Sequence, residues 1–329
     1  MQLLKFGTSL VLRVCRILIS RKKEKRWAET YLANLESEAD ANLPTDTAKK
    51  IVNAYSIYLP MVIDAFTQVD GRHTSLDEKK RILQYFVCST TFDDFTDNNE
   101  LTQEQLNEIS FGYSAYQPQT VQERLFLYCH VKLKQFVKDQ TGYSHATHAL
   151  FQAQVDSGKQ TDPTIPDDEL FRITIEKGAY SVLLCSFYME DGMLSDRWQE
   201  CWFQLGAIIQ LTNDLFDIWK DVRDGFQTLP VRTKDADQLY LTFTEMVDKL
   251  EGLIDNLPVP DSRKWKFRMN MMSICSFSDM AIQQLRAIQQ EHGKMPELNT
   301  LPRKALIIDM EKIGNIWHCM RFTYQRCRK

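Results

Sequence analysis

Three oxygen-bearing side chains recur at four-residue intervals in this chain: Asn213, Asp217 and Asp221. Apolar periodicity around them predicts a helix over residues 195–224, and positions four apart lie on one face of a helix. One amide and two carboxylates would therefore project together along about 12 Å of helix. Such oxygens suit hard cations, and Mg²⁺ is usually held by a few carboxylates with water and substrate phosphate. A solvated acidic helix face is the structural alternative.

A second acidic cluster ends another predicted helix, which covers residues 76–98. Asp93 and Asp97 share one face of this helix, and Asp94 follows Asp93 directly. Carboxylates at a helix C-terminus oppose the helix dipole, which favours cations there. This helix end is therefore expected to lose stability unless a positive group lies nearby. An acidic cap that leads into a turn is the alternative.

Apolar, aromatic or small residues precede both acidic clusters on the same helix faces. Two antiparallel helices of this design would enclose a cavity with an apolar wall and an acidic rim. Mg²⁺ on the rim would bind a diphosphate whose apolar tail enters the cavity, and this arrangement suits ionisation of a carbon–oxygen bond away from water. The candidate cavity residues are Phe86, Thr90, Tyr180, Trp202, Gly206 and Gln210.

The 329 residues carry almost no strand pattern, whereas apolar residues recur at helical spacing through most of the chain. We therefore expect an all-α fold, a single bundle of about ten helices around a central apolar cavity. The predicted helices cover residues 46–69, 76–98, 102–114, 119–140, 144–156, 167–190, 195–224, 235–256, 261–291 and 302–326. The net charge of -4 gives no argument for nucleic acid as a partner, and eight cysteines without a C-x-x-C pair favour a reducing, cytoplasmic location.

The N-terminus is predicted to be a basic amphipathic segment, residues 1–30, ahead of a helical domain over residues 31–329. Charges at Lys5, Arg13 and Arg16 interrupt its apolar run, which a membrane-spanning helix tolerates poorly. Two alternatives stay open. Residues 1–26 lie on an anionic membrane surface as a peripheral helix, or they pack on the body of the protein.

Both acidic clusters resemble the metal-binding motifs of class I isoprenoid synthases, the all-α superfamily of prenyltransferases, terpene synthases and squalene/phytoene synthases. Residues 93–97 match the aspartate-rich DDxxD motif. Residues 213–221 are similar to the terpene synthase pattern N-D-L-x-S/T-x-x-K-E, with Asp217 and Asp221 where that family has Ser or Thr and Glu. The squalene/phytoene synthase motif is similar over a longer stretch, at Leu205, Gly206, Gln210, Leu211, Thr212, Asn213, Asp217, Asp221, Gly225, Leu229 and Pro230.

Departures from these families bear on the reaction. Thr90 stands where squalene and phytoene synthases usually have Arg, and Phe226 stands where they have the Arg of a Gly-Arg pair. Residues 179–184 replace their glycine-containing kink, and residues 98–100 replace the arginine pair of chain-elongating prenyltransferases. These departures favour ionisation and cyclisation of one prenyl diphosphate. Head-to-head condensation of two prenyl diphosphates is the alternative, and a non-catalytic lipid- or partner-binding protein is a third hypothesis.

The resemblance implies a prenyl diphosphate substrate and three Mg²⁺ ions. Asp93 and Asp97, with Asp94 as a further candidate ligand, would hold two ions. The third would be held by Asn213, Asp217 and Asp221. The resemblance also makes a homodimer a candidate oligomeric state. The glycine after Lys177, in mid-helix, suggests a kink that exposes backbone to the cavity. The candidate diphosphate-binding residues are Lys177, Lys220, Arg172, Arg223, Arg321 and Tyr324.

Overall fold

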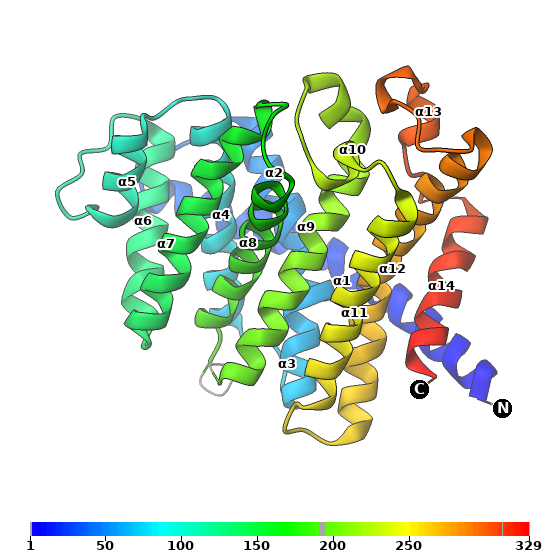
Figure 1. Ribbon diagram of the computed structural model, residues 1–329. Coiled ribbons are helices and arrows are strands. Elements are labelled where there is room, and N and C mark those ends of the chain that lie inside the picture. The colour runs from blue at the N-terminus through cyan, green and yellow to red at the C-terminus, as the bar shows by residue number, and fades with distance from the viewer. Residues whose placement is uncertain (1, 191–194, 311, 329) are drawn as a thin grey trace. The chain divides into compact units, whose positions relative to one another are not determined.

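The computed structural model describes residues 2–190, 195–310 and 312–328, and within these ranges all regular structure is helical (Figure 1). The predicted all-α class is confirmed, although the helices outnumber the ten expected. The α-helices are α1 (Gln2–Glu38), α2 (Thr45–Tyr58), α3 (Asp64–Asp70), α4 (Leu76–Asp97), α5 (Gln103–Phe111), α6 (Val121–Phe136), α7 (Gln140–Ser157), α8 (Asp167–Phe187), α9 (Asp196–Asp224), α10 (Leu229–Arg232), α11 (Ala236–Asp255), α12 (Asp261–His292), α13 (Arg303–Leu306) and α14 (Ile313–Cys327).

Proline explains two of the extra segments. The predicted helix 46–69 is divided into α2 and α3 by a π-helical turn, Leu59–Ile63, which contains Pro60. Proline has no backbone N–H and its ring crowds the preceding turn, so the regular hydrogen-bond ladder is interrupted there. Pro230 lies in the first turn of the short α10, where a missing N–H costs nothing.

Local capping fixes the ends of the two helices that carry the acidic clusters. The Ser75 side chain accepts a hydrogen bond from the Glu78 backbone while the Glu78 carboxylate accepts one from Ser75 N, which is a capping box at the start of α4. Gly225, at φ +77°, ends α9 in the left-handed conformation that glycine adopts without strain. Both acidic clusters therefore sit in the last turns of well-bounded helices.

The chain divides into two compact units. Unit 1 consists of Met1–Leu10, His145–Ser186 and Leu194–Lys329, and unit 2 of Val11–Ser144 and Phe187–Met193. In unit 1, α9 packs against α10, α11 and α12, and α14 packs along α12. In unit 2, α4 packs between α2 and α6. Large buried side chains fill each unit: Trp202, Phe243 and Phe267 in unit 1, and Tyr55, Phe66 and Phe95 in unit 2.

The first helix, α1, continues through the domain boundary predicted at residue 30, and that boundary stays a prediction. The central apolar cavity also stays a prediction. None of the described helices combines the length and the apolar character that crossing a bilayer requires.

Candidate functional site

The α4 cluster contains one buried and two exposed carboxylates. Asp94 is 8% exposed, and it accepts hydrogen bonds from Thr47 Oγ1 at 2.9 Å and from Lys50 Nζ at 2.8 Å. Asp93 and Asp97 are exposed to solvent at the end of the same helix. The three carboxylates thus divide between one that ties α4 to α2 and two that face water.

Lys50 is the positive group that the acidic end of α4 needs. Its ammonium group donates to Asp94, and that hydrogen bond, together with the charges of Asp97 and Asp93, raises the pKa of Lys50. The residue lies on α2, more than forty positions away in the sequence, so no local pattern pointed to it. Thr47 and Lys50 can both reach Asp94 because residues three apart lie on one face of α2.

The α9 cluster divides in the same way. Asn213 and Asp217 are exposed and Asp221 is partly buried, as expected for a row of oxygens along one face. Asp214, which the sequence analysis did not place in the site, is buried at 7% exposure. Its carboxylate accepts hydrogen bonds from Gln210 Nε2 at 2.8 Å and from Thr174 Oγ1 of α8 at 3.4 Å.

Burial and mutual repulsion disfavour ionisation along α9. Desolvation raises the pKa of Asp214 to about 6, and the nearby Lys177 opposes this shift in part. The pKa of Asp221 is raised to about 7, chiefly by desolvation and then by the charges of Asp214 and Asp217. Thr228 Oγ1 donates a long hydrogen bond of 3.4 Å to Asp221. These carboxylates therefore lack a sufficient counter-charge.

A glycine crossing sets the distance between α8 and α9. A Cβ on Gly178 would lie 2.5 Å from the Gly206 carbonyl oxygen, and a Cβ on Gly206 would overlap the Gly178 carbonyl oxygen. The two backbones thus touch, and this contact brings Thr174 and Lys177 beside Asp214. Because α8 is an unbroken helix through Gly178, close packing is the reason for this glycine, in place of the kink that the sequence suggested.

The candidate diphosphate-binding residues differ in how they are engaged. Arg172 donates to Asp156 and Glu176, each at 2.6 Å, which makes it part of an ion-pair network on the outside of α8. Arg223 donates to the neighbouring Asp224 and lies 5.0 Å above the ring of Trp219.

The remaining candidates differ in their exposure and in the effect of their charge on nearby carboxylates. Lys220 is exposed on α9 and its charge acts on Asp221. Lys177 acts on Asp214 through its charge. Arg321 and Tyr324 both lie on α14, where Arg321 is exposed and Tyr324 partly buried.

The candidate cavity residues are mostly packed. Phe86 is buried against the rings of Tyr55, Tyr58 and Tyr85, while Thr90 on the same helix is partly exposed. Trp202 is fully buried. Tyr180 packs edge-on against Phe203 and His145. Gln210 donates a hydrogen bond to Asp214, and Gly206 lies at the glycine crossing.

A cavity of about 300 Å³ opens beside Asp221 at the end of α9. It is lined by Arg232 at the end of α10, by Lys234 from the segment after α10, and by Phe226. Arg232 is paired with Asp167 at 2.8 Å, and Lys234 is exposed. Lys234 is therefore a basic group close to the α9 carboxylates that sequence reasoning missed, because a loop residue shows no helical spacing.

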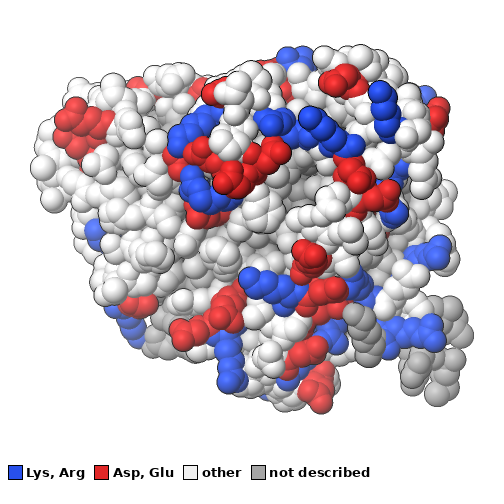
Figure 2. All heavy atoms as spheres, in the orientation of Figure 1, with Lys and Arg blue, Asp and Glu red and all other residues white. Residues whose placement is uncertain are grey.

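On the face shown in Figure 2, acidic and basic side chains are interspersed, and large uncharged areas separate them. Within the described residues, no group of three or more His, Cys, Asp or Glu side chains is arranged to hold a metal ion. No protein-family model matches the chain, and no curated protein matches it either.

Proposed function

We propose that this protein is an Mg²⁺-dependent, class I terpene synthase-like enzyme that ionises a prenyl diphosphate and cyclises or rearranges the resulting carbocation. The proposal starts from the resemblance of residues 93–97 and 213–221 to the two metal motifs of that superfamily. It requires the carboxylates of α4 and α9 to bind the same diphosphate.

One structural observation supports it most: in both motifs, the residues that are open to solvent match metal ligands, although the candidate ligand Asp221 is partly buried and the candidate ligand Asp94 is buried. On α9, Asn213 and Asp217 are exposed, whereas Asp214, between them in sequence, is buried and hydrogen-bonded. On α4, Asp93 and Asp97 are exposed, whereas Asp94 is buried and hydrogen-bonded. We therefore assign the buried aspartates a positioning role and keep the exposed residues as ligands.

The donor set fits a hard cation. The ligands are carboxylate and amide oxygens. Burial, and then repulsion from Asp214 and Asp217, raise the pKa of Asp221, and a bound cation would relieve that repulsion. Bound Mg²⁺ would neutralise the diphosphate leaving group as the carbon–oxygen bond breaks. Lys220 and Lys177, on the α9 and α8 sides of the carboxylates, would hold diphosphate oxygens through charge-assisted hydrogen bonds.

The direct test is incubation of the purified chain with geranyl, farnesyl or geranylgeranyl diphosphate and Mg²⁺, followed by measurement of released diphosphate and product mass. We expect release from one of these substrates alone, and a product with the carbon count of that substrate. Asp217→Asn should abolish most of it, whereas Glu200→Gln, an exposed carboxylate near the other end of α9, should not. Absence of release from all three substrates contradicts the proposal.

The same experiment tests the alternative, a condensation of two prenyl diphosphates, because that product has twice the carbon count. The longer squalene/phytoene synthase motif, which suggested this condensation, includes residues that have structural roles in this fold. Gly206 allows the helix crossing, Gly225 ends α9, and Pro230 begins α10. The flanks of the motif are thus explained by folding, and they add no support for a second substrate.

A further inference from the structure

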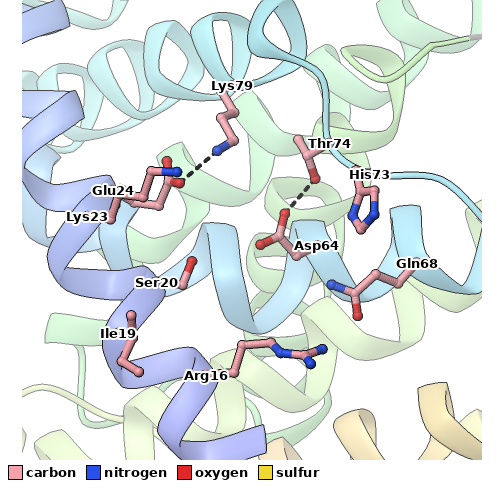
Figure 3. Close-up of a pocket in the computed structure, with 10 residues that line it drawn as sticks. All are labelled: Arg16, Ile19, Ser20, Lys23, Glu24, Asp64, Gln68, His73, Thr74 and Lys79. Atoms are coloured by element: carbon pink, nitrogen blue, oxygen red, sulfur yellow. Dashed lines mark hydrogen bonds and ion pairs between the residues drawn. The ribbon is translucent and has the colours of Figure 1, made fainter.

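A separate cavity of about 600 Å³ lies in unit 2, between α1, α3 and the start of α4 (Figure 3). None of the residues in the two acidic motifs lines it. Its volume falls within the range of small-molecule sites, which is about 300–1,000 Å³. All lining residues except Ile19 have polar or charged side chains, and they come from helix faces and from the turn that joins α3 to α4.

The two carboxylates in this cavity already have partners. Glu24 accepts a hydrogen bond from Lys79 Nζ at 2.7 Å, and Asp64 accepts one from Thr74 Oγ1 at 2.6 Å, both drawn as dashed lines in Figure 3. Glu24 is only 4% exposed, so the Glu24–Lys79 pair forms part of the wall. The Glu24–Lys79 pair is therefore balanced in charge, whereas Asp64, whose partner is a hydroxyl group, still offsets part of the positive charge at the opening.

The opening is also lined by two cationic side chains of α1, Arg16 and Lys23, and by the imidazole of His73 from the turn after α3. All three are exposed, and no ion pair joins Arg16 or Lys23 to another residue in the described part of the chain. In Figure 3, Arg16 reaches from α1 toward Asp64 and Gln68 on α3. The opening thus has more positive charge than its own carboxylates balance.

Arg13, one turn before Arg16 on α1, is affected by this excess charge. Burial, and then the charge of Arg16, lower the pKa of Arg13, and Asp64 offsets part of the effect, which leaves the pKa at about 10. Two guanidinium groups that repel each other around one carboxylate are a setting in which a bound anion is stabilising.

Neutral groups complete the site. Ser20 and Gln68 line the cavity and can exchange hydrogen bonds with hydroxyl groups. Ile19, 71% exposed, provides an apolar lip beside them. A ligand with a doubly charged anionic group and neighbouring hydroxyls would match both the basic side chains and the neutral hydrogen-bonding side chains of the lining.

We propose that this cavity binds a phosphomonoester, with the phosphate held by Arg16, Lys23 and His73 and the adjoining hydroxyls held by Ser20 and Gln68. A phosphomonoester offers three terminal oxygens and close to two negative charges, which suits several separate cationic donors better than a single carboxylate does. The proposal does not depend on the reaction proposed above, because the two sets of residues do not overlap.

The test is calorimetric titration of the full chain with glycerol 3-phosphate and with inorganic phosphate. We expect saturable binding of glycerol 3-phosphate that falls by about tenfold or more in the double variant Arg16→Gln/Lys23→Gln, because charge-assisted hydrogen bonds are lost. The matched control is Arg21→Gln/Lys22→Gln, which removes two exposed charges from the same helix outside the cavity. It should bind as the unchanged chain does.

Two outcomes overturn the proposal: no saturable binding of glycerol 3-phosphate to the unchanged chain, or an equal loss in both double variants, which would indicate general attraction to a basic helix. The thermal unfolding midpoint of each variant shows whether it is folded. Both replaced residues are exposed, so we expect little change in that midpoint.

Vesicles distinguish the two sources of a phosphomonoester. Phosphatidic acid presents a phosphomonoester head group, whereas phosphatidylglycerol presents a phosphodiester, so phosphatidylcholine vesicles with either lipid at equal charge separate head-group recognition from membrane charge. Binding to phosphatidic acid vesicles alone, displaced by glycerol 3-phosphate, identifies a lipid head group. Binding of glycerol 3-phosphate without vesicle binding identifies a soluble ligand. Equal binding to both vesicles, unaffected by glycerol 3-phosphate, contradicts the proposal.

Discussion

Two aspartates in different units of this molecule are held in the same way. Asp94 of α4 is held by Thr47 and Lys50 of α2, and Asp214 of α9 has Thr174 and Lys177 of α8 beside it. In each case a threonine and a lysine three residues apart on a neighbouring helix face the second residue of an acidic motif. The exposed members of both motifs flank the buried one.

The difference lies in the lysine. Lys50 contacts Asp94 directly at 2.8 Å, whereas Lys177 acts on Asp214 through its charge, and the hydrogen bonds to Asp214 come from Gln210 and Thr174. As a result, the α4 cluster has a counter-ion on α2, while burial and repulsion keep the pKa values of Asp214 and Asp221 raised. The α9 carboxylates therefore have more to gain from a bound cation than those of α4.

The largest effect on stability is expected when the α8–α9 crossing is broken. In Gly206→Ala the new Cβ would overlap the Gly178 carbonyl oxygen, so the helices must separate, at a cost of about 3 kcal/mol. The matched control is Gly252→Ala in α11, where nothing lies within 4 Å of the new Cβ and a gain of about 1 kcal/mol is expected from helix propensity. Thermal and urea unfolding measure both. Equal midpoints for the two variants would contradict the packing argument.

Removal of the buried α4 carboxylate is the next largest effect. Asp94→Ala leaves the buried Thr47 hydroxyl without its acceptor, and we expect a loss of about 2 kcal/mol. Asp97→Ala, in an exposed position of the same helix end, should change stability little or raise it slightly, since a charge that opposes the helix dipole is removed. If both substitutions cost the same, Asp94 has no special positioning role.

Asp214→Asn should increase the stability of the protein, whereas the two substitutions above decrease it. The pKa of Asp214 is raised to about 6, so the folded state holds its proton more tightly than the unfolded chain does. The resulting stability is complete below the unfolded pKa near 4 and is lost as the pH rises through about 6. Asn removes that loss, so the variant should be more stable than the unchanged chain by about 1 kcal/mol at pH 8 and no more stable at pH 3. A destabilised variant at pH 8 contradicts the assigned role of burial.

The smallest effect is expected at Lys50. Its side chain is 63% exposed, so the ion pair with Asp94 is screened by water, and Lys50→Gln should cost about 0.5 kcal/mol. Lys49→Gln is the matched control, because Lys49 pairs with the exposed Asp46 on the same helix. Urea unfolding with and without added salt measures the difference. The gap between the two variants should shrink as salt rises, and a gap that salt leaves unchanged would argue against an ion-pair origin.

Much of the fold could be predicted from the sequence, because helical periodicity and turn residues act locally. The predicted limits of the helix over residues 195–224 differ from those of α9 by one residue, and those over 76–98 from α4 by one residue. The short α10 was missed because four residues show no period. The prediction of one helix over residues 302–326 was wrong, because this stretch is divided into α13 and α14. The face shared by Asn213 and Asp217 was equally accessible to sequence reasoning, since it depends on spacing within one helix.

The partners of the buried aspartates could not be predicted. Thr47 and Lys50 are separated from Asp94 by more than forty residues, and Thr174 is forty residues from Asp214, so only the packing of helices brings them together. The structural role of Gly178 also depends on a distant segment. A glycine in mid-helix fits a kink and a close helix crossing equally well until the neighbouring helix is known. Long-range contacts, and the burial that follows from them, are what the sequence alone lacked.

The most direct test of the central claim is diphosphate release by Asp217→Asn compared with the unchanged chain, each with a prenyl diphosphate and with or without Mg²⁺. The account predicts release that needs Mg²⁺ and falls by about a hundredfold or more in the variant, because stabilisation of the leaving group is lost, while the unfolding midpoint stays unchanged. Release that persists without Mg²⁺, or an Asp217→Asn variant as active as the unchanged chain, would contradict it.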